Sequence, residues 1–311
     1  MNSVLFFKAL ADETRLRIVH LLRDHELNVN ELTAILEMGQ SRISRHLKIL
    51  TDSEIISFRR DGLWSFYSIT GNSRIQRFIE ETSFLLAAMP QARLDLEKRE
   101  QVLKQRRRET TVLFNSLAGH WEKIKQEIFG NTDVNREILD TVDPCLTLVD
   151  IGCGTGDLIR VISAKAQKVI GVDNSPRMLE QAAGFLEAEK AGIDLRLGNI
   201  EHLPLRDNET DAAVLNMVLH HCETPVLILK EANRVLHAAG TLVLADFLKH
   251  NREIMRARYG DRRLGFDPAE LESAFTESGF TVKESRIIPL EGGLKIILYK
   301  AFKEEDINAG S

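Results

Sequence analysis

The sequence has few cysteines and lacks any long apolar run. Its 311 residues include three cysteines, Cys145, Cys153 and Cys222. An odd number of cysteines, none of them before residue 145, excludes a disulfide framework and indicates reduced thiols. No stretch approaches the roughly 18 uncharged apolar residues of a membrane span, and Lys8 interrupts the apolar run near the N-terminus. We therefore expect a cytoplasmic protein with no signal peptide and no membrane anchor.

Composition places the chain among ordinary globular proteins of more than one domain. Hydrophobic residues make up 43% and charged residues 28% of the 311 residues, which is enough apolar material for cores and a length beyond one small domain. The net charge of −5 is divided unevenly. Residues 1–110 hold 18 Lys and Arg against 15 Asp and Glu, a balance of +3, which leaves −8 for the remainder. If the chain contacts nucleic acid, the N-terminal part is the better candidate.

Three segments follow one another along the chain. In the first, residues 1–89, apolar residues recur at helical spacing, and two alternating runs flank Asp61-Gly62 as in a β-hairpin. The second, residues 90–111, is dense in charge and predicts a solvated connecting helix. In the third, residues 112–302, short β-branched runs alternate with helical stretches, which is typical of a parallel sheet covered by helices. We expect residues 303–311 to form a disordered tail.

The first segment contains a predicted helix-turn-helix. Asn28 to Leu36 and Gln40 to Leu50 are expected to form two helices separated by a tight turn, Glu37-Met38-Gly39. On the second helix Ile43, Leu47 and Leu50 fall on one face, so the opposite face of hydroxyls and cations can meet DNA bases and phosphates. The predicted DNA-contacting residues are Ser41, Arg42, Ser44, Arg45, His46 and Lys48, with Arg59 and Arg60 at the tip of the hairpin.

These residues resemble the ArsR family of winged-helix repressors. The resemblance covers residues 4–85 and rests on FKALADETRLRIVHLL, SRISRHLKIL and GLWSFYSI. It implies a homodimer, joined by the first helix and the helix around Ile75 to Ala88, that binds a double-stranded, imperfectly palindromic operator. Many members sense soft metals through a Cys-Val-Cys pattern, but Asn28, Val29 and Asn30 stand there. Because amides do not replace thiolates as soft-metal ligands, the effector must bind elsewhere.

The third segment opens with an apolar strand that leads into a glycine-rich loop. Leu146 to Ile151 runs into Gly152-Cys153-Gly154-Thr155-Gly156, and Asp173 ends the next strand, 23 residues after Asp150. Such a loop lets a ligand approach the backbone, and a carboxylate at Asp173 can accept both hydroxyls of a ribose. A nicotinamide dinucleotide is one possible ligand. The preceding Asp150 suits the ammonium and sulfonium of S-adenosylmethionine better.

The segment resembles the class I S-adenosylmethionine-dependent methyltransferases, most nearly the quinone C-methyltransferases. VDIGCGTG, VIGVDNSPRMLEQA, GNIEHLPL, DAAVLNMVLHH and LILKEANRVLHAAGTLVLADF follow in family order over residues 112–301. The resemblance implies a Rossmann-like α/β fold with a mostly parallel seven-stranded sheet. It also implies S-adenosylmethionine or S-adenosylhomocysteine as ligand. The implied binding residues are Asp150, Gly152, Cys153, Gly154, Gly156, Asp173, Asn174, Met178, Asn199, Ile200 and Asn216.

Three features depart from the family pattern. Asn199 stands where Asp is common, although its amide oxygen can still accept a hydrogen bond from adenine. Ala238-Ala239-Gly240 replaces the usual Pro-Gly-Gly turn. No general base is fixed, though methyl transfer needs alignment more than acid or base help. His220, His221, Cys222, Asp246 and His250 could converge where two strands end, and the candidates for a catalytic role are His220, His221 and Asp246. No metal site is expected, because these residues lack a recognised ligand spacing.

The fusion of the two modules leads to two hypotheses. In the first, the protein is a transcriptional repressor whose operator affinity is set by S-adenosylhomocysteine or S-adenosylmethionine, with residues 90–111 as the transmitter. In the second, it is an active methyltransferase of a small-molecule acceptor that carries a DNA-binding domain. A module that only dimerises is less favoured because Arg42, Arg45 and Lys48 face outward.

Overall fold

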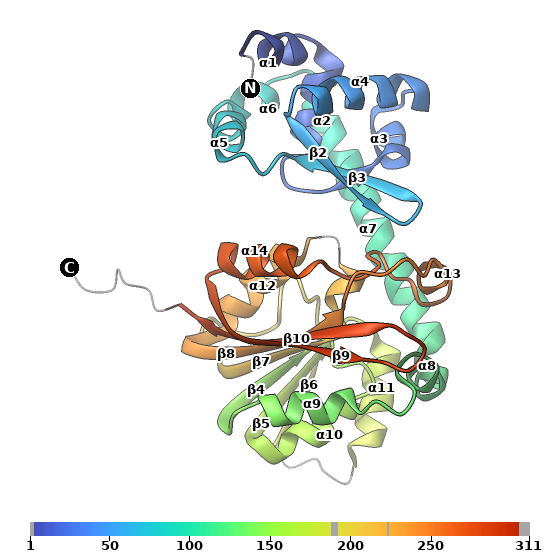
Figure 1. Cartoon of the computed structure of the whole chain (residues 1–311), viewed down its shortest axis with the longest axis vertical. Coiled ribbons are helices and arrows are strands. Elements are labelled where there is room, and N and C mark those ends of the chain that lie inside the picture. The colour runs from blue at the N-terminus through green and yellow to red at the C-terminus, as the bar shows by residue number, and fades with distance from the viewer. Residues whose placement is uncertain (1–2, 188–191, 223, 305–311) are drawn as a thin grey trace, which may run out of the picture. The chain divides into compact units, whose positions relative to one another are not determined.

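The chain folds into two compact units. The computed structural model describes residues 3–187, 192–222 and 224–304, and the units comprise Met1–Glu109 and Thr110–Ser311 (Figure 1). The expected linker, residues 90–111, therefore does not stand apart from both units. Among the described residues, no helix is long and apolar enough to cross a membrane.

The N-terminal unit is mainly helical and carries a small antiparallel sheet of order β1-β3-β2. Its elements are α1 (Ser3–Leu10), α2 (Glu13–Leu21), β1 (Leu27–Asn28), α3 (Val29–Leu36), α4 (Gln40–Asp52), β2 (Ile56–Asp61), β3 (Trp64–Ile69), α5 (Ser73–Glu81), α6 (Ser83–Ala87) and the first part of α7 (Ala92–Leu117). The predicted hairpin is confirmed, since Asp61 pairs with Trp64 and Gly62 turns the chain at φ +57°.

Helices α3 and α4 form the predicted helix-turn-helix. Asn28 and Glu31 cap α3 reciprocally, and Glu37 ends it in the left-handed conformation at φ +54°. On α4 the residues spaced for the core, Ile43, Leu47 and Leu50, are at most 1% exposed. The opposite face of α4 is consequently left to solvent.

Helix α7 differs from the solvated connector that its composition predicts. Asp95, Arg99, Leu103 and Arg106 are buried on it. The reason is that its charges meet opposite charges on other helices: Asp95 pairs with Arg17 of α2 at 2.6 Å, and Arg106 pairs with Glu31 of α3. Composition alone does not reveal such partners, so the charge density of this segment predicted a solvent-exposed helix. Residues 92–109 of α7 belong to the N-terminal unit, and residues 110–117 belong to the second.

The second unit is a seven-stranded sheet of order β6-β5-β4-β7-β8-β10-β9, parallel except for its β10 pairings. This confirms the predicted Rossmann-like fold with a mostly parallel sheet. The strands are β4 (Cys145–Ile151), β5 (Ala166–Asp173), β6 (Ile193–Leu197), β7 (Thr210–Asn216), β8 (Leu236–Phe247), β9 (Phe280–Pro289) and β10 (Lys295–Lys303).

Helices cover both faces of the sheet (Figure 1). Helices α8 (Trp121–Phe129), α9 (Val134–Thr141), α10 (Asp157–Ile162), α11 (Pro176–Phe185) and α13 (Ile254–Tyr259) contribute to one apolar cluster, and α12 (Pro225–Val235) and α14 (Pro268–Glu277) to the other. Short 3₁₀ helices lie at Ala118–His120, Ser163–Lys165 and Leu219–His221. The strand order reverses between β4 and β7, and such a switch point is where open α/β sheets place their ligands.

Residue 303, where the sequence predicts the tail to start, lies in the folded unit. Lys303 ends β10, and its ammonium donates to the carbonyl oxygens of Asn233 at 2.9 Å and Leu236 at 2.7 Å. These contacts hold it in the folded unit. The rest of the predicted tail from residue 305 onward lies outside the described residues.

Candidate ligand pocket and DNA-contacting surface

Two buried acceptor oxygens flank the switch point between β4 and β7. Asp150, on β4, is 1% exposed, and Asn216 is the last residue of β7, the neighbouring strand. Among the described residues, neither Asp150 Oδ2 nor Asn216 Oδ1 has a hydrogen-bond partner. Because buried polar atoms are normally paired, these two oxygens indicate a site for a donor or a cation that comes from a ligand.

The glycine loop has the backbone that its sequence predicts. Gly152, Gly154 and Gly156 have φ values of +78°, +52° and +81°, a region that L side chains rarely adopt. A Cβ on Gly152 would lie 2.6 Å from Val218 Cγ2, whereas a Cβ on Gly154 would meet no atom of the described residues within 4 Å. Gly152 therefore permits close packing, and Gly154 leaves open space in which a ligand could approach.

The carboxylate of Asp173 is held in place by the loop. Its Oδ2 accepts from the Gly154 amide at 2.9 Å, and its Oδ1 accepts from the Ser175 amide at 2.8 Å. Burial raises the pKa of Asp173, and the two amides counter this effect. The carboxylate is thus oriented at the end of β5, next to the half-buried Asn174, where its predicted ribose contact would need it.

The electrostatics of Asp150 are unusual. Burial, followed by the nearby carboxylates of Asp173 and Asp157, raises the pKa of Asp150 from 3.8 to about 8. A carboxyl group in this setting keeps its proton at neutral pH unless a cation supplies the missing charge. The arrangement suits a cationic ligand group.

The remaining predicted pocket residues lie on the loops and helices beside these strands. Asn199 and Ile200 are half-buried after β6, and Asn199 Oδ1 already accepts from the Glu201 amide at 3.1 Å. A carbonyl oxygen has two lone pairs, so one remains for a ligand. Met178 and Cys153 are buried, and burial raises the pKa of the Cys153 thiol, which is consistent with a packing role. The contacts of all these residues with a ligand stay predictions.

The candidate catalytic residues lie close together, with His220 and His221 after β7 and Asp246 near the end of β8. His220 Nδ1 lies 2.8 Å from Asp246 Oδ1, and the His220 amide donates to Asp246 Oδ2. The His220 and His221 ring centroids are 3.9 Å apart. Asp261, which sequence reasoning missed, lies 3.8 Å from His220 Nε2. Burial alone would lower the pKa of His220, but Asp246 and Asp261 raise it.

Cys222 and His250, which the sequence also predicts to lie near these residues, have different surroundings. The Cys222 thiol donates to the Val218 carbonyl and belongs to the apolar core. The His250 ring packs edge-on against Phe247, 5.4 Å between centroids. Neither is within the group that could hold an ion, which consists of His220, His221 and Asp261 among the described residues.

The end of α7 forms part of the pocket region, which sequence reasoning also missed. Ser175 Oγ donates to Asn115 Oδ1 at 2.7 Å, and Ser175 is fully buried beside Asp173. The Phe114 ring meets the His221 ring edge-on at 4.8 Å. No local pattern indicated these contacts, because residues 112–117 continue a charged helix.

In the N-terminal unit, α4 presents its predicted polar face. Ser41, Arg42, Ser44, Arg45 and Lys48 are exposed. His46 is different, because its side chain is only 12% exposed and its Nδ1 lies 3.7 Å from Asp12. On the hairpin, Arg60 is exposed, whereas Arg59 pairs with Glu26 and Asp61. The structure thus presents five α4 residues and Arg60 to solvent, and directs His46 and Arg59 toward protein partners.

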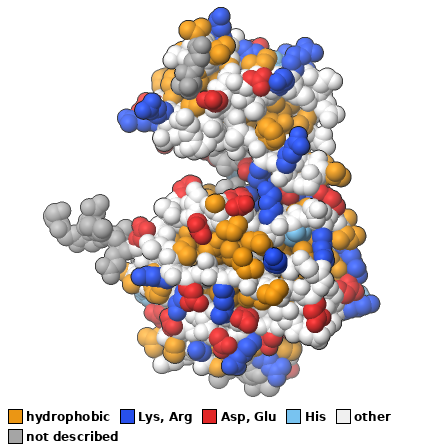
Figure 2. All heavy atoms as spheres, in the orientation of Figure 1, with side chains coloured by type: hydrophobic (Ala, Val, Ile, Leu, Met, Phe, Trp, Pro, Cys, Tyr) orange, Lys and Arg blue, Asp and Glu red, His pale blue; other side chains and the backbone are white. Residues whose placement is uncertain are grey.

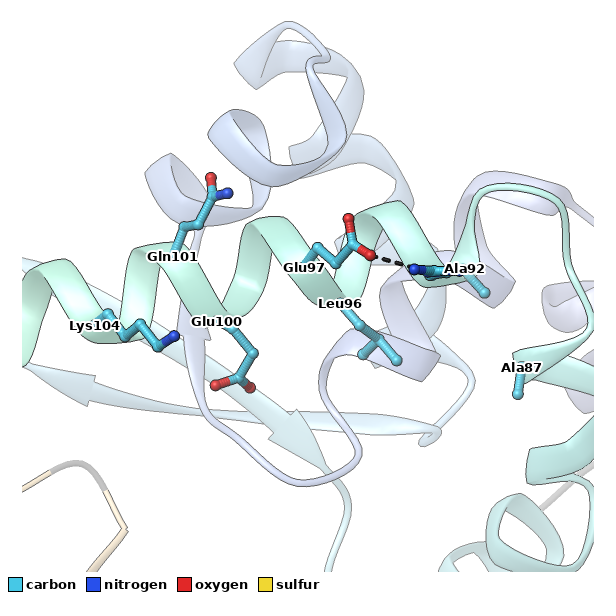
Figure 3. A pocket seen from close by; sticks show the side chains of 8 residues that line it. Ala87, Ala92, Leu96, Glu97, Glu100, Gln101 and Lys104 are labelled. Atoms are coloured by element: carbon cyan, nitrogen blue, oxygen red, sulfur yellow. Dashed lines mark hydrogen bonds and ion pairs between the residues drawn. The ribbon is translucent and has the colours of Figure 1, made fainter.

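A groove of about 590 Å³ runs along α6 and α7 in the same unit (Figure 3). It is lined by Ala87, Ala92, Arg93, Leu96, Glu97, Glu100, Gln101 and Lys104. Across one turn of α7, Arg93 pairs with Glu97 at 3.0 Å. Charges of both signs line the groove, so it favours neither an anion nor a cation.

Comparison with known proteins assigns both units. Residues 12–57 match the family model for bacterial regulatory proteins of the arsR family, and residues 149–244 match a methyltransferase domain. The chain therefore carries an arsR-type regulatory domain and a methyltransferase domain. Both resemblances inferred from the sequence, to arsR-type regulators and to methyltransferases, are thereby confirmed.

Two curated relatives are each similar to part of the chain. The arsenic resistance transcriptional regulator ArsR1 of Pseudomonas putida is 47% identical over 70 residues, 22% of this chain and 55% of the regulator. Demethylmenaquinone methyltransferase of Symbiobacterium thermophilum is 33% identical over 137 residues, 42% of this chain and 51% of the enzyme. The chain thus spans about half the length of these curated relatives.

A solved structure supports the fold of the second unit. It comes from the complex of the Haloferax volcanii Trm112 methyltransferase activator with a methyltransferase. The superposition has a TM-score of 0.54 at 19% sequence identity. It includes 62% of this protein and 98% of the matched chain. At this identity the likeness concerns the fold alone.

Proposed function

We propose that this protein is a transcriptional repressor whose operator affinity is controlled by S-adenosylhomocysteine or S-adenosylmethionine bound in its methyltransferase domain. The observation that carries the proposal is the pair of buried acceptors without partners, Asp150 Oδ2 and Asn216 Oδ1, beside an open glycine loop. They occur in a chain whose other unit exposes Arg42, Arg45 and Lys48 on a recognition helix.

The pocket fits the chemistry of these ligands. Asp150 and Asn216 would accept from the ammonium of the amino-acid arm, and Asp173 would accept from the ribose hydroxyls. Asn199 would accept from the adenine amino group, and Gly154 leaves room for close approach. When bound, S-adenosylmethionine supplies a methyl group on a sulfonium. A regulator needs only the binding.

The DNA-binding unit would work as a dimer. Val4, Leu5 and Phe7 of α1 and Phe84 and Leu85 of α6 are each more than half exposed, and hydrophobic side chains gather around the start of α1 in Figure 2. Exposed apolar residues on two elements favour burial in an interface. A second copy is the occupant that the family resemblance implies, and dimerisation would present two recognition helices to one palindrome.

Helix α7 offers a route between ligand and operator. At one end Asn115 accepts from Ser175, whose amide in turn donates to the predicted ribose carboxylate of Asp173. Nearer the other end Lys98 pairs at 2.8 Å with Glu37, the left-handed residue in the turn between α3 and α4. A ligand that shifts Ser175 would therefore act on a helix that also holds the helix-turn-helix.

Control requires that the ligand bind the free and the DNA-bound protein with different affinity. A hundredfold difference corresponds to about 2.7 kcal/mol of coupling free energy, within the usual range for two linked sites.

The second candidate function is methyl transfer to a small-molecule acceptor. It is favoured by the His220–Asp246 pair, in which a carboxylate orients a histidine as it does around a general base. Burial, followed by the charge of His220, lowers the pKa of His221, which would keep that second histidine unprotonated and able to take a proton.

Fluorescence anisotropy on promoter DNA distinguishes the two functions. The full-length protein is titrated at fixed salt alone, with S-adenosylmethionine and with S-adenosylhomocysteine. A shift of tenfold or more with either ligand supports the regulator. Tight DNA binding that ignores both ligands would reject ligand control and favour the enzyme.

Two variants test the assignments behind this experiment. Arg45→Ala should weaken operator binding by about 1–3 kcal/mol, while Arg136→Ala, which removes an exposed arginine of α9, should not. Asp173→Ala should abolish the ligand effect while leaving DNA binding intact. Normal ligand uptake by Asp173→Ala in calorimetry would refute the pocket assignment.

A further inference from the structure

Three potential metal ligands meet next to the ends of β7 and β8. One ligand atom from each of His220, His221 and Asp261 lies within 4.8 Å of the other two. His220 Nε2 is 3.8 Å and His221 Nδ1 is 3.9 Å from Asp261 Oδ1. We propose that this group, the His-His-Asp cluster, binds a divalent transition-metal ion such as Zn²⁺.

A carboxylate behind the cluster prepares His220 as a ligand. Asp246 Oδ1 lies 2.8 Å from His220 Nδ1, and Asp246 is itself held by the backbone amides of Phe247 and His220. A carboxylate accepts from Nδ1–H, so Nε2 is the nitrogen directed to Asp261. Metal-binding histidines are usually oriented in this way by an outer carboxylate.

The distances suit a small ion after a slight contraction. Ligand atoms around a tetrahedral ion with bonds of about 2.0–2.1 Å lie about 3.3–3.4 Å apart, and the two measured separations exceed this by about half an ångström. His221 Nδ1 is 3.4 Å from the Gly260 carbonyl oxygen, longer than an ordinary N–H···O bond. That nitrogen is therefore held weakly and can turn to an ion.

The donor set selects the class of metal. Two imidazoles with one carboxylate favour zinc and its transition-metal neighbours over magnesium or calcium, which prefer oxygen ligands. Three protein ligands also leave one tetrahedral position for water or another molecule. Because the three residues follow β7 and α13, 40 residues apart in the chain, their spacing matches no recognised metal motif.

Spectroscopic titration with Co²⁺ tests the cluster. The untagged full-length protein is freed of metal with a chelator, titrated with Co²⁺ and then challenged with Zn²⁺. We expect one Co²⁺ per chain, visible bands of a four- or five-coordinate ion without thiolate charge transfer, and displacement by Zn²⁺. Asp261→Asn and His221→Gln should each weaken Co²⁺ binding at least a hundredfold. Asp246→Asn removes only the outer carboxylate and should weaken it about 10–100-fold.

Controls separate the cluster from other sites. His237→Gln changes an exposed histidine on β8 and should bind Co²⁺ as the unaltered protein does. Circular dichroism checks the fold of each variant, and the unaltered protein decides the question even if a variant misfolds. No saturable uptake, thiolate bands, or unchanged binding by folded Asp261→Asn would overturn the proposal.

Discussion

The buried carboxyl of Asp150 leads to a sharp prediction about ligand binding. Its pKa is raised to about 8 mainly by burial, so the ligand-free protein holds a proton there at neutral pH. Pairing with the ammonium of S-adenosylhomocysteine requires the charged carboxylate, and binding must then release the proton. The association constant should rise with pH wherever the group is protonated in the free protein.

The size of the effect follows from the pKa. Each pH unit below about 8 costs 1.36 kcal/mol of binding free energy, or a factor of about ten. Between about pH 5.5 and 7, where an amino group stays protonated, affinity should rise about thirtyfold, which is about 2 kcal/mol. Near pH 6 almost one proton should be released for each ligand bound.

Isothermal titration calorimetry in two buffers of different ionisation enthalpy measures both quantities. Asp150→Asn should bind more weakly at pH 7 and lose the pH dependence, because an amide does not titrate. The matched control is Asp194→Asn, since the pKa of this half-buried carboxylate is lowered chiefly by its hydrogen bond with Arg196. That variant should bind with the same pH dependence as the unaltered protein.

The carboxyl group of Asp150 also makes the folded, ligand-free protein less stable as the pH rises. Because its folded-state pKa lies above the ordinary 3.8, the folded state binds more protons than the unfolded state between these values, and the free energy of unfolding falls as pH rises from about 4 to 8. Asp150→Asn should therefore raise the melting temperature of the ligand-free protein at pH 8. Affinity independent of pH, with no proton release, would refute the reasoning, as would unaltered binding by Asp150→Asn.

Three further predictions concern the regulator. Arg60→Ala should weaken operator binding and reduce its salt dependence in anisotropy titrations, while Arg59→Ala should chiefly lower the melting temperature, because Arg59 is tied to protein carboxylates; equal effects on DNA binding would contradict this. Phe84→Asp should convert a dimer to a monomer in analytical ultracentrifugation, since it places a charge in an apolar patch, and an unchanged mass would reject this interface. Asn115→Ala should keep ligand affinity within about threefold but remove most of the ligand's effect on DNA binding, because it deletes the acceptor of Ser175; full ligand control in this variant would exclude the route through α7.

Local patterns were sufficient for the elements that carry both modules. The spacing of Ile43, Leu47 and Leu50 identified the buried face of α4, because a helix places residues three and four apart on one side. The glycine loop was equally predictable, since positive φ values at Gly152 and Gly154 depend on the residue itself. Both features arise from interactions within a few residues.

Partners distant in the chain were not predictable in this way. The charges of α7 meet Arg17 and Glu31, and its composition suggested solvent instead. Asp261 joins His220 only through the fold, because nothing near it in sequence marks it as a ligand. The pairing of Arg59 with Glu26, 33 residues away in the chain, was likewise not predictable from the local pattern of the hairpin.

The sequence by itself determined the two modules, the exposed face of the recognition helix and the loop that opens the pocket, because these depend on short-range periodicity and backbone preference. The tertiary structure decided which charges are satisfied within the protein, which buried acceptors remain for a ligand and which histidines meet Asp261. Those properties depend on packing between residues far apart in the chain, because burial determines how strongly charged and polar groups interact.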